Sequence, residues 1–210
     1  IVCRTPEHLS DGIKSKLSMF CSLPKENIIE AIDVPNIYQI PLNFYHQKMD
    51  EIVLKQFKLN INKINIKYWE DLVDTVNNLN KVKTIALVGK YVELHDAYLS
   101  VAESLRHAGY KYKTKIDIKW IDSEKLEGCT NIEEEFKGIN GIIVPGGFGS
   151  RGTEGMIMAI KYARENNIPF LGICLGMQLS VIEFARNVCK LEDASSTEFN
   201  PNTKNPIIDL

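Results

Sequence analysis

The chain has 210 residues, with 25 Lys and Arg against 27 Asp and Glu, and a formal net charge of −2. This length suffices for one large or two small domains, each with a hydrophobic core. The balanced charge and the lack of a basic tail argue against a nucleic-acid partner. The 5 cysteines are scattered and form no CxxC pair. This pattern indicates reduced thiols in the cytoplasm, without a disulfide framework or a metal site. No apolar run is long enough to span a membrane, so a membrane partner is not expected.

The first 58 residues predict short, mixed elements. Ser10 or Asp11 is placed to cap a helix that ends at Cys21. Pro41-Leu42-Asn43 is expected to separate two later helical segments. Together the elements expected here are the helix to Cys21, a strand at residues 27–32 and helical segments at 36–40 and 49–57. Ile1 reads as the end of a strand and the last residues as an open apolar run, so we expect an internal piece of a longer chain.

Residues 59–83 are rich in Asn and Lys and predict an interdomain linker that carries one amphipathic helix around Tyr68 to Val76. From residue 84 strands and helices alternate, which is typical of a doubly wound α/β sheet. The expected strands are 85–88, 116–121, 142–144 and 168–173, and the expected helices start at Asp96 (stopped by Gly109), at Glu154 and after Cys174. Ligands bind such sheets at the carboxyl ends of the strands.

The strongest motif is Gly172-Ile173-Cys174-Leu175-Gly176, which follows a short apolar strand and precedes an amphipathic run. Strand, tight turn and helix are the layout of a nucleophile elbow. The two glycines remove Cβ atoms that would collide at such a turn. Cys174 would lie at a helix N-terminus, which favours the thiolate, and the Leu175 amide would face a developing oxyanion. The motif indicates acyl-transfer chemistry; an inert cysteine in a Gly-rich turn is the alternative.

A second glycine-rich loop, Pro145-Gly146-Gly147-Phe148-Gly149, also follows a buried strand. Its backbone N–H groups are free to turn toward a ligand, although such a loop can also be only a flexible turn. Because both loops follow buried strands of one sheet, we expect them to lie side by side and form a joint site. No Gly-Lys-Ser or Gly-Lys-Thr follows, so the loop is not a phosphate-binding P-loop.

The sequence offers no convincing base for the cysteine, which needs a histidine within hydrogen-bond reach. His8 and His46 belong to the other half of the chain. His107 lies near the end of a helix, where a solvated or dipole-compensating role is expected. His95 follows the first strand of the sheet and is the one remaining candidate.

The two glycine-rich motifs resemble the class I glutamine amidotransferases. Val88-Gly89-Lys90-Tyr91 and Ser196-Thr197-Glu198-Phe199 narrow the resemblance to the CTP synthase family. The resemblance implies that residues 1–58 are the C-terminal end of an α/β synthetase (amidoligase) domain and that residues 59–83 are the interdomain linker. Residues 84–210 would then be a glutaminase domain, a doubly wound sheet truncated at its C-terminus.

The resemblance implies a ligase that forms a C–N bond, using ATP to aminate UTP to CTP with ammonia released from L-glutamine. It also implies Mg²⁺ with ATP, bound mainly outside these residues, GTP as an allosteric activator, no prosthetic group and a cytoplasmic homotetramer. The family's triad His and Glu and its P-loop are not among these residues, so we expect no turnover from this chain alone. A catalytically silent amidotransferase-like binding domain is the alternative. A peptidase-like hydrolase is disfavoured, because Leu175 stands where those enzymes carry histidine.

The resemblance also assigns roles to individual residues. Cys174 matches the nucleophile, and Gly147 and Leu175 match the oxyanion-hole donors. Glu198 matches the residue that pairs with the α-amino group of glutamine. The full glutamine-binding and oxyanion set is Gly147, Phe148, Leu175, Gly176, Met177, Gln178 and Glu198. The nucleotide-binding set is Lys16, Phe20, Asp33 and Val34, with Lys16 and Phe20 at the pyrimidine site and Val34 at the ATP base.

Overall fold

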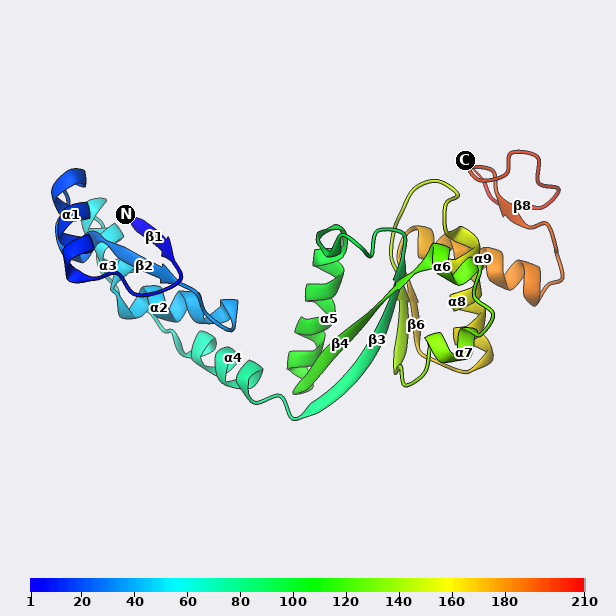
Figure 1. The fold of residues 1–210 in the computed structure, drawn as a ribbon, viewed down its shortest axis with the longest axis horizontal. Helices are drawn as coiled ribbons and strands as arrows, with labels where there is room; N and C mark the ends of the chain where they lie inside the picture. Colours follow the sequence, from blue (N-terminus) through cyan, green and yellow to red (C-terminus); the bar gives the residue numbers. More distant parts are fainter. Residues whose placement is uncertain (210) are drawn as a thin grey trace. The chain divides into compact units, whose positions relative to one another are not determined.

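The computed structural model describes residues 1–209. The chain divides into two compact units, Ile1–Asn78 and Leu79–Leu210 (Figure 1). None of the helices in the described part combines the length and apolar character that a membrane crossing needs.

The first unit is built on two parallel strands with helices around them. Its elements are β1 (Val2–Thr5), α1 (Asp11–Cys21), the short 3-10 turn η1 (Lys25–Asn27), β2 (Ile29–Ile32), the 3-10 turn η2 (Ile37–Gln39), α2 (Ile40–His46), α3 (Met49–Gln56) and α4 (Lys67–Asn77). Ser10 caps α1, because its side chain accepts a hydrogen bond from the Ile13 N–H. The expected helix to Cys21 is therefore confirmed, and so is a strand within residues 27–32.

One expectation in this unit is wrong. Pro41 does not separate two helices; it lies in the first turn of α2, where a missing N–H leaves no helical hydrogen bond unmade. The break comes later, at Gln47 and Lys48, and Lys48 has a left-handed φ of 59°. The helical segments after η2 thus continue through the proline.

The second unit contains a four-stranded parallel sheet in the order β4-β3-β5-β6. Its elements are β3 (Lys81–Gly89), the 3-10 turn η3 (His95–Tyr98), α5 (Leu99–Lys111), β4 (Thr114–Asp122), α6 (Ser123–Glu127), α7 (Ile132–Glu135), β5 (Gly141–Val144), α8 (Thr153–Glu165), β6 (Phe170–Gly172), α9 (Leu175–Asn187), β7 (Ser195–Ser196) and β8 (Pro206–Ile208). The chain passes from β3 outward to β4 and then back across β3 to β5. This reversal of direction is the topological switch point at which doubly wound sheets bind ligands.

Helices cover both faces of the sheet, α5 on one face and α8 with α9 on the other (Figure 1). The alternation of side chains along the strands explains the two cores. Val88 and Val144 pack in the larger core with side chains of α8 and α9. Leu87 and Ile143 point the other way and pack with Tyr98 and the inner side of α5. The expected doubly wound α/β sheet is confirmed.

Three details differ from expectation. β3 begins at Lys81 and so takes the last residues of the segment expected to be linker. α5 does not stop at Gly109: it runs through to Lys111, and Gly109 is buried where an added Cβ would lie 2.4 Å from the Thr114 carbonyl oxygen. The glycine is therefore needed because β4 passes close to it, and it does not end the helix. Two short helices, α6 and α7, stand between β4 and β5, where no helix was expected.

Candidate active site

Cys174 stands at the tip of the turn between β6 and α9. It occupies the N-cap position of α9 with φ 50° and ψ −106°, a backbone conformation that residues other than glycine rarely adopt. Such strain costs on the order of 1–3 kcal/mol and persists only where the surrounding structure imposes it. Cys174 is exposed, so it is not a cysteine packed into the core.

The two flanking glycines are required by space. A Cβ at Gly172 would lie 2.5 Å from the Gly176 carbonyl oxygen, and a Cβ at Gly176 would lie 2.0 Å from the Val144 carbonyl oxygen. Both contacts are with backbone atoms, which no side-chain rotation can relieve. The two glycines therefore allow α9 to start close against β5.

The glycine-rich loop after β5 lies beside the cysteine, as expected. An ideal Cβ at Gly146 would be 3.6 Å from the Cβ of Cys174, and one at Gly147 would be 3.3 Å from the Leu175 side chain. Among the backbone hydrogen bonds of residues 1–209 that lie outside the internal bonding of helices and strands, none uses the N–H of Gly147 or Leu175 as donor. Two uncommitted N–H groups beside a nucleophile are the arrangement that stabilises an oxyanion.

Lys90 supports this loop, and the sequence reasoning did not single it out. The residue follows β3 directly and is 5% exposed. Its Nζ donates to the carbonyl oxygens of Phe148, at 2.9 Å, and of Gly149. The pKa of Lys90 lies below its ordinary value, mainly because the side chain is buried and, to a smaller extent, because the positive charge of Arg151 is nearby. A charged residue immediately after a buried strand, at the ligand-binding edge of a parallel sheet, was the signal that could have revealed it.

The other residues expected to hold glutamine surround the same turn. Phe148 is 86% exposed, and Met177, in the first turn of α9, is 56% exposed. Gln178 is half-buried on α9, and its N–H donates to the Cys174 carbonyl at 3.1 Å. Glu198, from the segment after β7, accepts a hydrogen bond from the Gly149 N–H at 3.2 Å. The second unit thus gathers the elbow, the glycine loop and Glu198 in one place.

The four histidines have other surroundings. His95 stacks on the Trp120 ring with centroids 4.2 Å apart. The His107 ring lies 3.8 Å from Glu103 within α5, and His8 pairs with Glu30 in the first unit. His46, also in the first unit, lies against Tyr45. These contacts give none of them an evident role as the base for Cys174.

The residues expected to bind nucleotides lie in the first unit. Lys16 and Phe20 stand one turn apart on α1, and Phe20 is 79% exposed. Asp33 and Val34 follow β2, and Asp33 forms an ion pair with Arg4 of β1. Phe20 therefore presents its ring to the surroundings, whereas Asp33 already has a charged partner.

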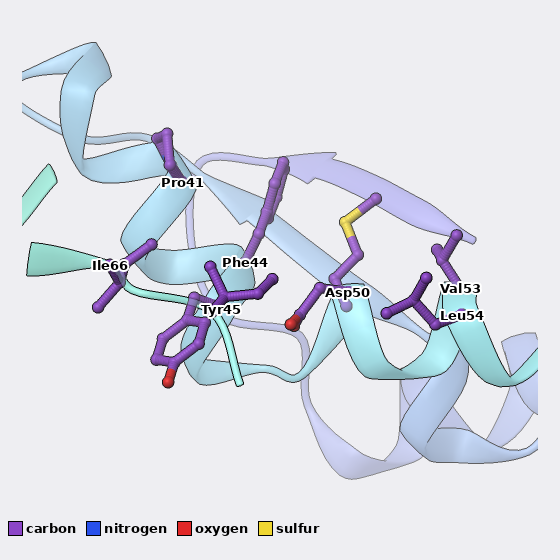
Figure 2. A pocket seen from close by; sticks show the side chains of 9 residues that line it. Pro41, Phe44, Tyr45, Asp50, Val53, Leu54 and Ile66 are labelled. Atoms are coloured by element: carbon purple, nitrogen blue, oxygen red, sulfur yellow. The ribbon is translucent and has the colours of Figure 1, made fainter. Parts of the chain in front are cut away.

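The first unit also contains an open apolar pocket of about 460 Å³, lined by residues of α2 and α3 and by Ile64 and Ile66. Figure 2 shows Phe44 and Tyr45 of α2 facing Val53 and Leu54 of α3 across it. None of the predicted nucleotide-binding residues lines it.

Two family models match the chain. The model described as "Glutamine amidotransferase class-I" matches residues 93–205, and the one described as "CTP synthase N-terminus" matches residues 1–59. The curated relatives include proteins named CTP synthase from Desulfitobacterium hafniense (strain Y51), 53% identical, and Caldanaerobacter subterraneus subsp. tengcongensis, 52% identical. Both alignments cover 210 residues, which is 100% of this chain and 39% of each relative. The chain therefore spans well under half the length of these relatives.

A solved structure of the Trypanosoma brucei CTPS glutaminase domain with bound acivicin resembles the chain with a TM-score of 0.56. The two are 43% identical, and the match covers 61% of this chain and 50% of that one. A parallel, doubly wound sheet with a cysteine at a strand-to-helix elbow is the architecture expected of an amidotransferase-type α/β domain. The chain belongs to the class I glutamine amidotransferases and, among them, to the CTP synthase family. The expected fold and family are thereby confirmed.

Proposed function

We propose that this chain is part of a ligase that aminates UTP to CTP, and that its second unit releases the required ammonia from L-glutamine. The observation that carries the proposal is the strained backbone of Cys174, with a φ of 50°, at the start of α9, with the Gly146–Gly149 loop against it. The names of the curated relatives support CTP as the product. In this proposal ATP is the energy source, GTP the activator and the assembled protein a cytoplasmic homotetramer.

The chemistry at the elbow follows from the geometry. The Cys174 sulfur attacks the side-chain carboxamide carbon of glutamine, and the amide oxygen takes up the negative charge. The N–H groups of Gly147 and Leu175 donate to this oxygen, and loss of one such donor costs roughly 10²–10³ in rate. When the intermediate collapses, the C–N bond breaks, and the leaving nitrogen takes a proton from an acid and departs as ammonia. Water then cleaves the thioester to glutamate and restores the thiol.

The proton transfers need a histidine, which we place outside these residues together with its carboxylate partner. Glu198 is suited to the substrate's α-amino group because a carboxylate pairs with an ammonium. Phe148 and Met177 offer apolar surface to the substrate's methylene chain, and Gly176 and Gln178 complete the binding set around the elbow. The chain alone then binds glutamine and reacts with it slowly, without rapid turnover.

Lys16 and Phe20 are proposed to contact the pyrimidine nucleotide, and Asp33 and Val34 the ATP base. A lysine ammonium suits a phosphate, and an exposed aromatic ring suits a base. Among residues 1–209 no group of three or more His, Cys, Asp or Glu side chains is placed to hold a metal ion. The family resemblance is the basis for proposing that ATP-bound Mg²⁺ is held mainly outside these residues.

The glutaminase proposal is tested with a chloroketone in which chloromethyl replaces the amide nitrogen of glutamine. The Cys174 sulfur displaces chloride, and peptide mass spectrometry locates the adduct. We expect one adduct at Cys174, suppressed by excess L-glutamine, while the exposed Cys189 serves as the internal control. Labelling of both cysteines at equal rates, unaffected by glutamine, would contradict the proposal and favour a silent binding domain. Glutamate release at a rate within about tenfold of that of a full-length relative would contradict the proposal that the catalytic histidine lies outside these residues.

The nucleotide proposal is tested by calorimetric titration with UTP. Phe20→Ala and Lys16→Ala are each expected to weaken binding about tenfold, since stacking or a charge-assisted contact contributes about 1–3 kcal/mol. Lys25→Ala, in the neighbouring turn η1, is the matched control and should leave the affinity unchanged. Equal losses in Lys16→Ala and Lys25→Ala, with no loss in Phe20→Ala, would show that general charge, and not this face of α1, attracts the nucleotide.

A further inference from the structure

Lys90 contacts the glycine-rich loop along the length of its side chain. Its Cδ and Cε lie 3.5 Å from the position that a Cβ on Gly147 would occupy. Its Nζ reaches two successive carbonyl oxygens, those of Phe148 and Gly149. The side chain is buried, so it passes beneath the loop with little contact with solvent.

The two carbonyl contacts explain how a buried ammonium is tolerated. Burial of an unpaired charge is strongly unfavourable, and an ammonium has three N–H donors to satisfy. The carbonyls of residues 148 and 149 accept two of them. The loop would lose these acceptors if its peptide groups rotated, so the lysine restrains their orientation.

The peptide group between Phe148 and Gly149 is held at both ends. Its oxygen accepts from Lys90 at 2.9 Å, and its N–H donates to Glu198 at 3.2 Å. Because a trans peptide is planar and places C=O and N–H on opposite sides, these two contacts fix its rotation. Gly149 itself has a left-handed φ of 70°, and a glycine has wide conformational freedom that must be restricted by such contacts.

We propose that Lys90 is a positioning residue that holds the 146–149 loop so that the Gly147 N–H faces the oxyanion. The inference rests on the proposed glutaminase function. If the α-amino group of glutamine takes Glu198 as its partner, one end of the 148–149 peptide is released. Lys90 then remains as the restraint on the loop while the substrate is bound. Preorganised donors of this kind contribute most when they do not have to reorient during the reaction.

The test compares Lys90→Met with the unchanged chain and with Lys161→Met, an exposed lysine of α8, as the matched control. Each is labelled with the glutamine-like chloroketone and, separately, with iodoacetamide. The chloroketone oxygen needs the oxyanion donors, whereas iodoacetamide reports only the reactivity of the thiol. Lys90→Met should slow the chloroketone reaction at Cys174 about tenfold or more and change the iodoacetamide rate by less than about twofold. Lys161→Met should change neither.

Amide hydrogen exchange of Gly149, whose N–H donates to Glu198, provides a readout independent of chemistry when followed by NMR. We expect exchange at this amide to rise about tenfold in Lys90→Met, as a restrained loop becomes mobile. If Lys90→Met does not fold, Lys90→Gln, whose shorter side chain cannot reach both carbonyls, should show the same changes.

Unchanged exchange, or equal effects on both reagents, overturns the positioning role. If the unchanged chain shows no selective reaction with the chloroketone, the proposed function fails, and the exchange data still decide whether Lys90 holds the loop.

Discussion

Gly176 offers a direct test of how tightly the elbow is built. A Cβ at this position would lie 2.0 Å from the Val144 carbonyl oxygen and 2.8 Å from its carbon. Val144 is fully buried in β5, and the same oxygen accepts the Ile173 N–H at 2.9 Å. Neither the strand nor the helix can move away without breaking this hydrogen bond, so Gly176→Ala should be strongly destabilising.

The magnitude follows from three contributions. Overpacking a core costs about 1–3 kcal/mol, and a rigid backbone contact belongs at the upper end of that range. Weakening the bond between Ile173 and Val144 adds about 1 kcal/mol, and replacing glycine by alanine in a helix returns about 1 kcal/mol. The net loss is about 3 kcal/mol, which for a chain of this length corresponds to a fall in Tm of about 10 °C.

Thermal and urea unfolding measure this effect by fluorescence. In a Trp69→Phe background, Trp120 alone reports on the second unit, because Trp69 lies in the first. The matched control is Gly128→Ala, where φ is −98° and no atom lies within 4 Å of the added Cβ. The control should stay within about 0.5 kcal/mol of the parent. If Gly176→Ala melts within about 2 °C of the control, the steric account of the elbow is wrong.

Two further predictions concern buried carboxylates. Glu183 is 1% exposed and accepts from Arg164 Nε and Nη2 at 2.8–3.1 Å. Arg164→Ala should therefore lower the urea stability of the second unit by about 3–5 kcal/mol, and a double variant with Glu183→Leu should recover much of it; no recovery would contradict the pairing argument. Burial raises the pKa of Glu30, but hydrogen bonds from His8, a backbone N–H and Lys14 outweigh it and hold the pKa below its ordinary value. The unfolded chain thus binds this proton more readily, so the contribution is complete above the ordinary value of 4.5 and is lost as pH falls through the folded value. In urea titrations across that range, Glu30→Gln should reduce the loss of stability at low pH; an unchanged profile would refute the assignment.

The elbow was predictable because its chemistry is local. Glycines two residues on either side of Cys174, between an apolar strand and an amphipathic run, leave few backbone arrangements that avoid collision. The sheet was predictable for a similar reason: short apolar runs alternate with helical periodicity, and parallel strands bring their carboxyl ends to one edge. The adjacency of the Gly146 loop and Cys174 followed from that edge alone.

What escaped prediction depends on contacts distant in sequence. The position of Lys90 after a buried strand can be read from the sequence, but its partners cannot. They are the carbonyls of Phe148 and Gly149, which lie 58 and 59 positions later in the chain. Gly109 looked like a helix end, yet its reason is the close passage of Thr114 after the chain has turned back. Pro41 predicts a break between helices, yet a proline fits the first turn of a helix, which is where the structure places it.

The spacing between Gly146 and Cys174 has a practical consequence. The Cβ–Cβ separation of 3.6 Å that a side chain at 146 would have falls within the range of about 3.5–4.5 Å found in disulfides. A single Gly146→Cys exchange would therefore let the nucleophile be capped by its own neighbour under oxidising conditions and released again by a reductant. A single substitution at Gly146 would thus make the reactivity of Cys174 reversibly dependent on the redox conditions.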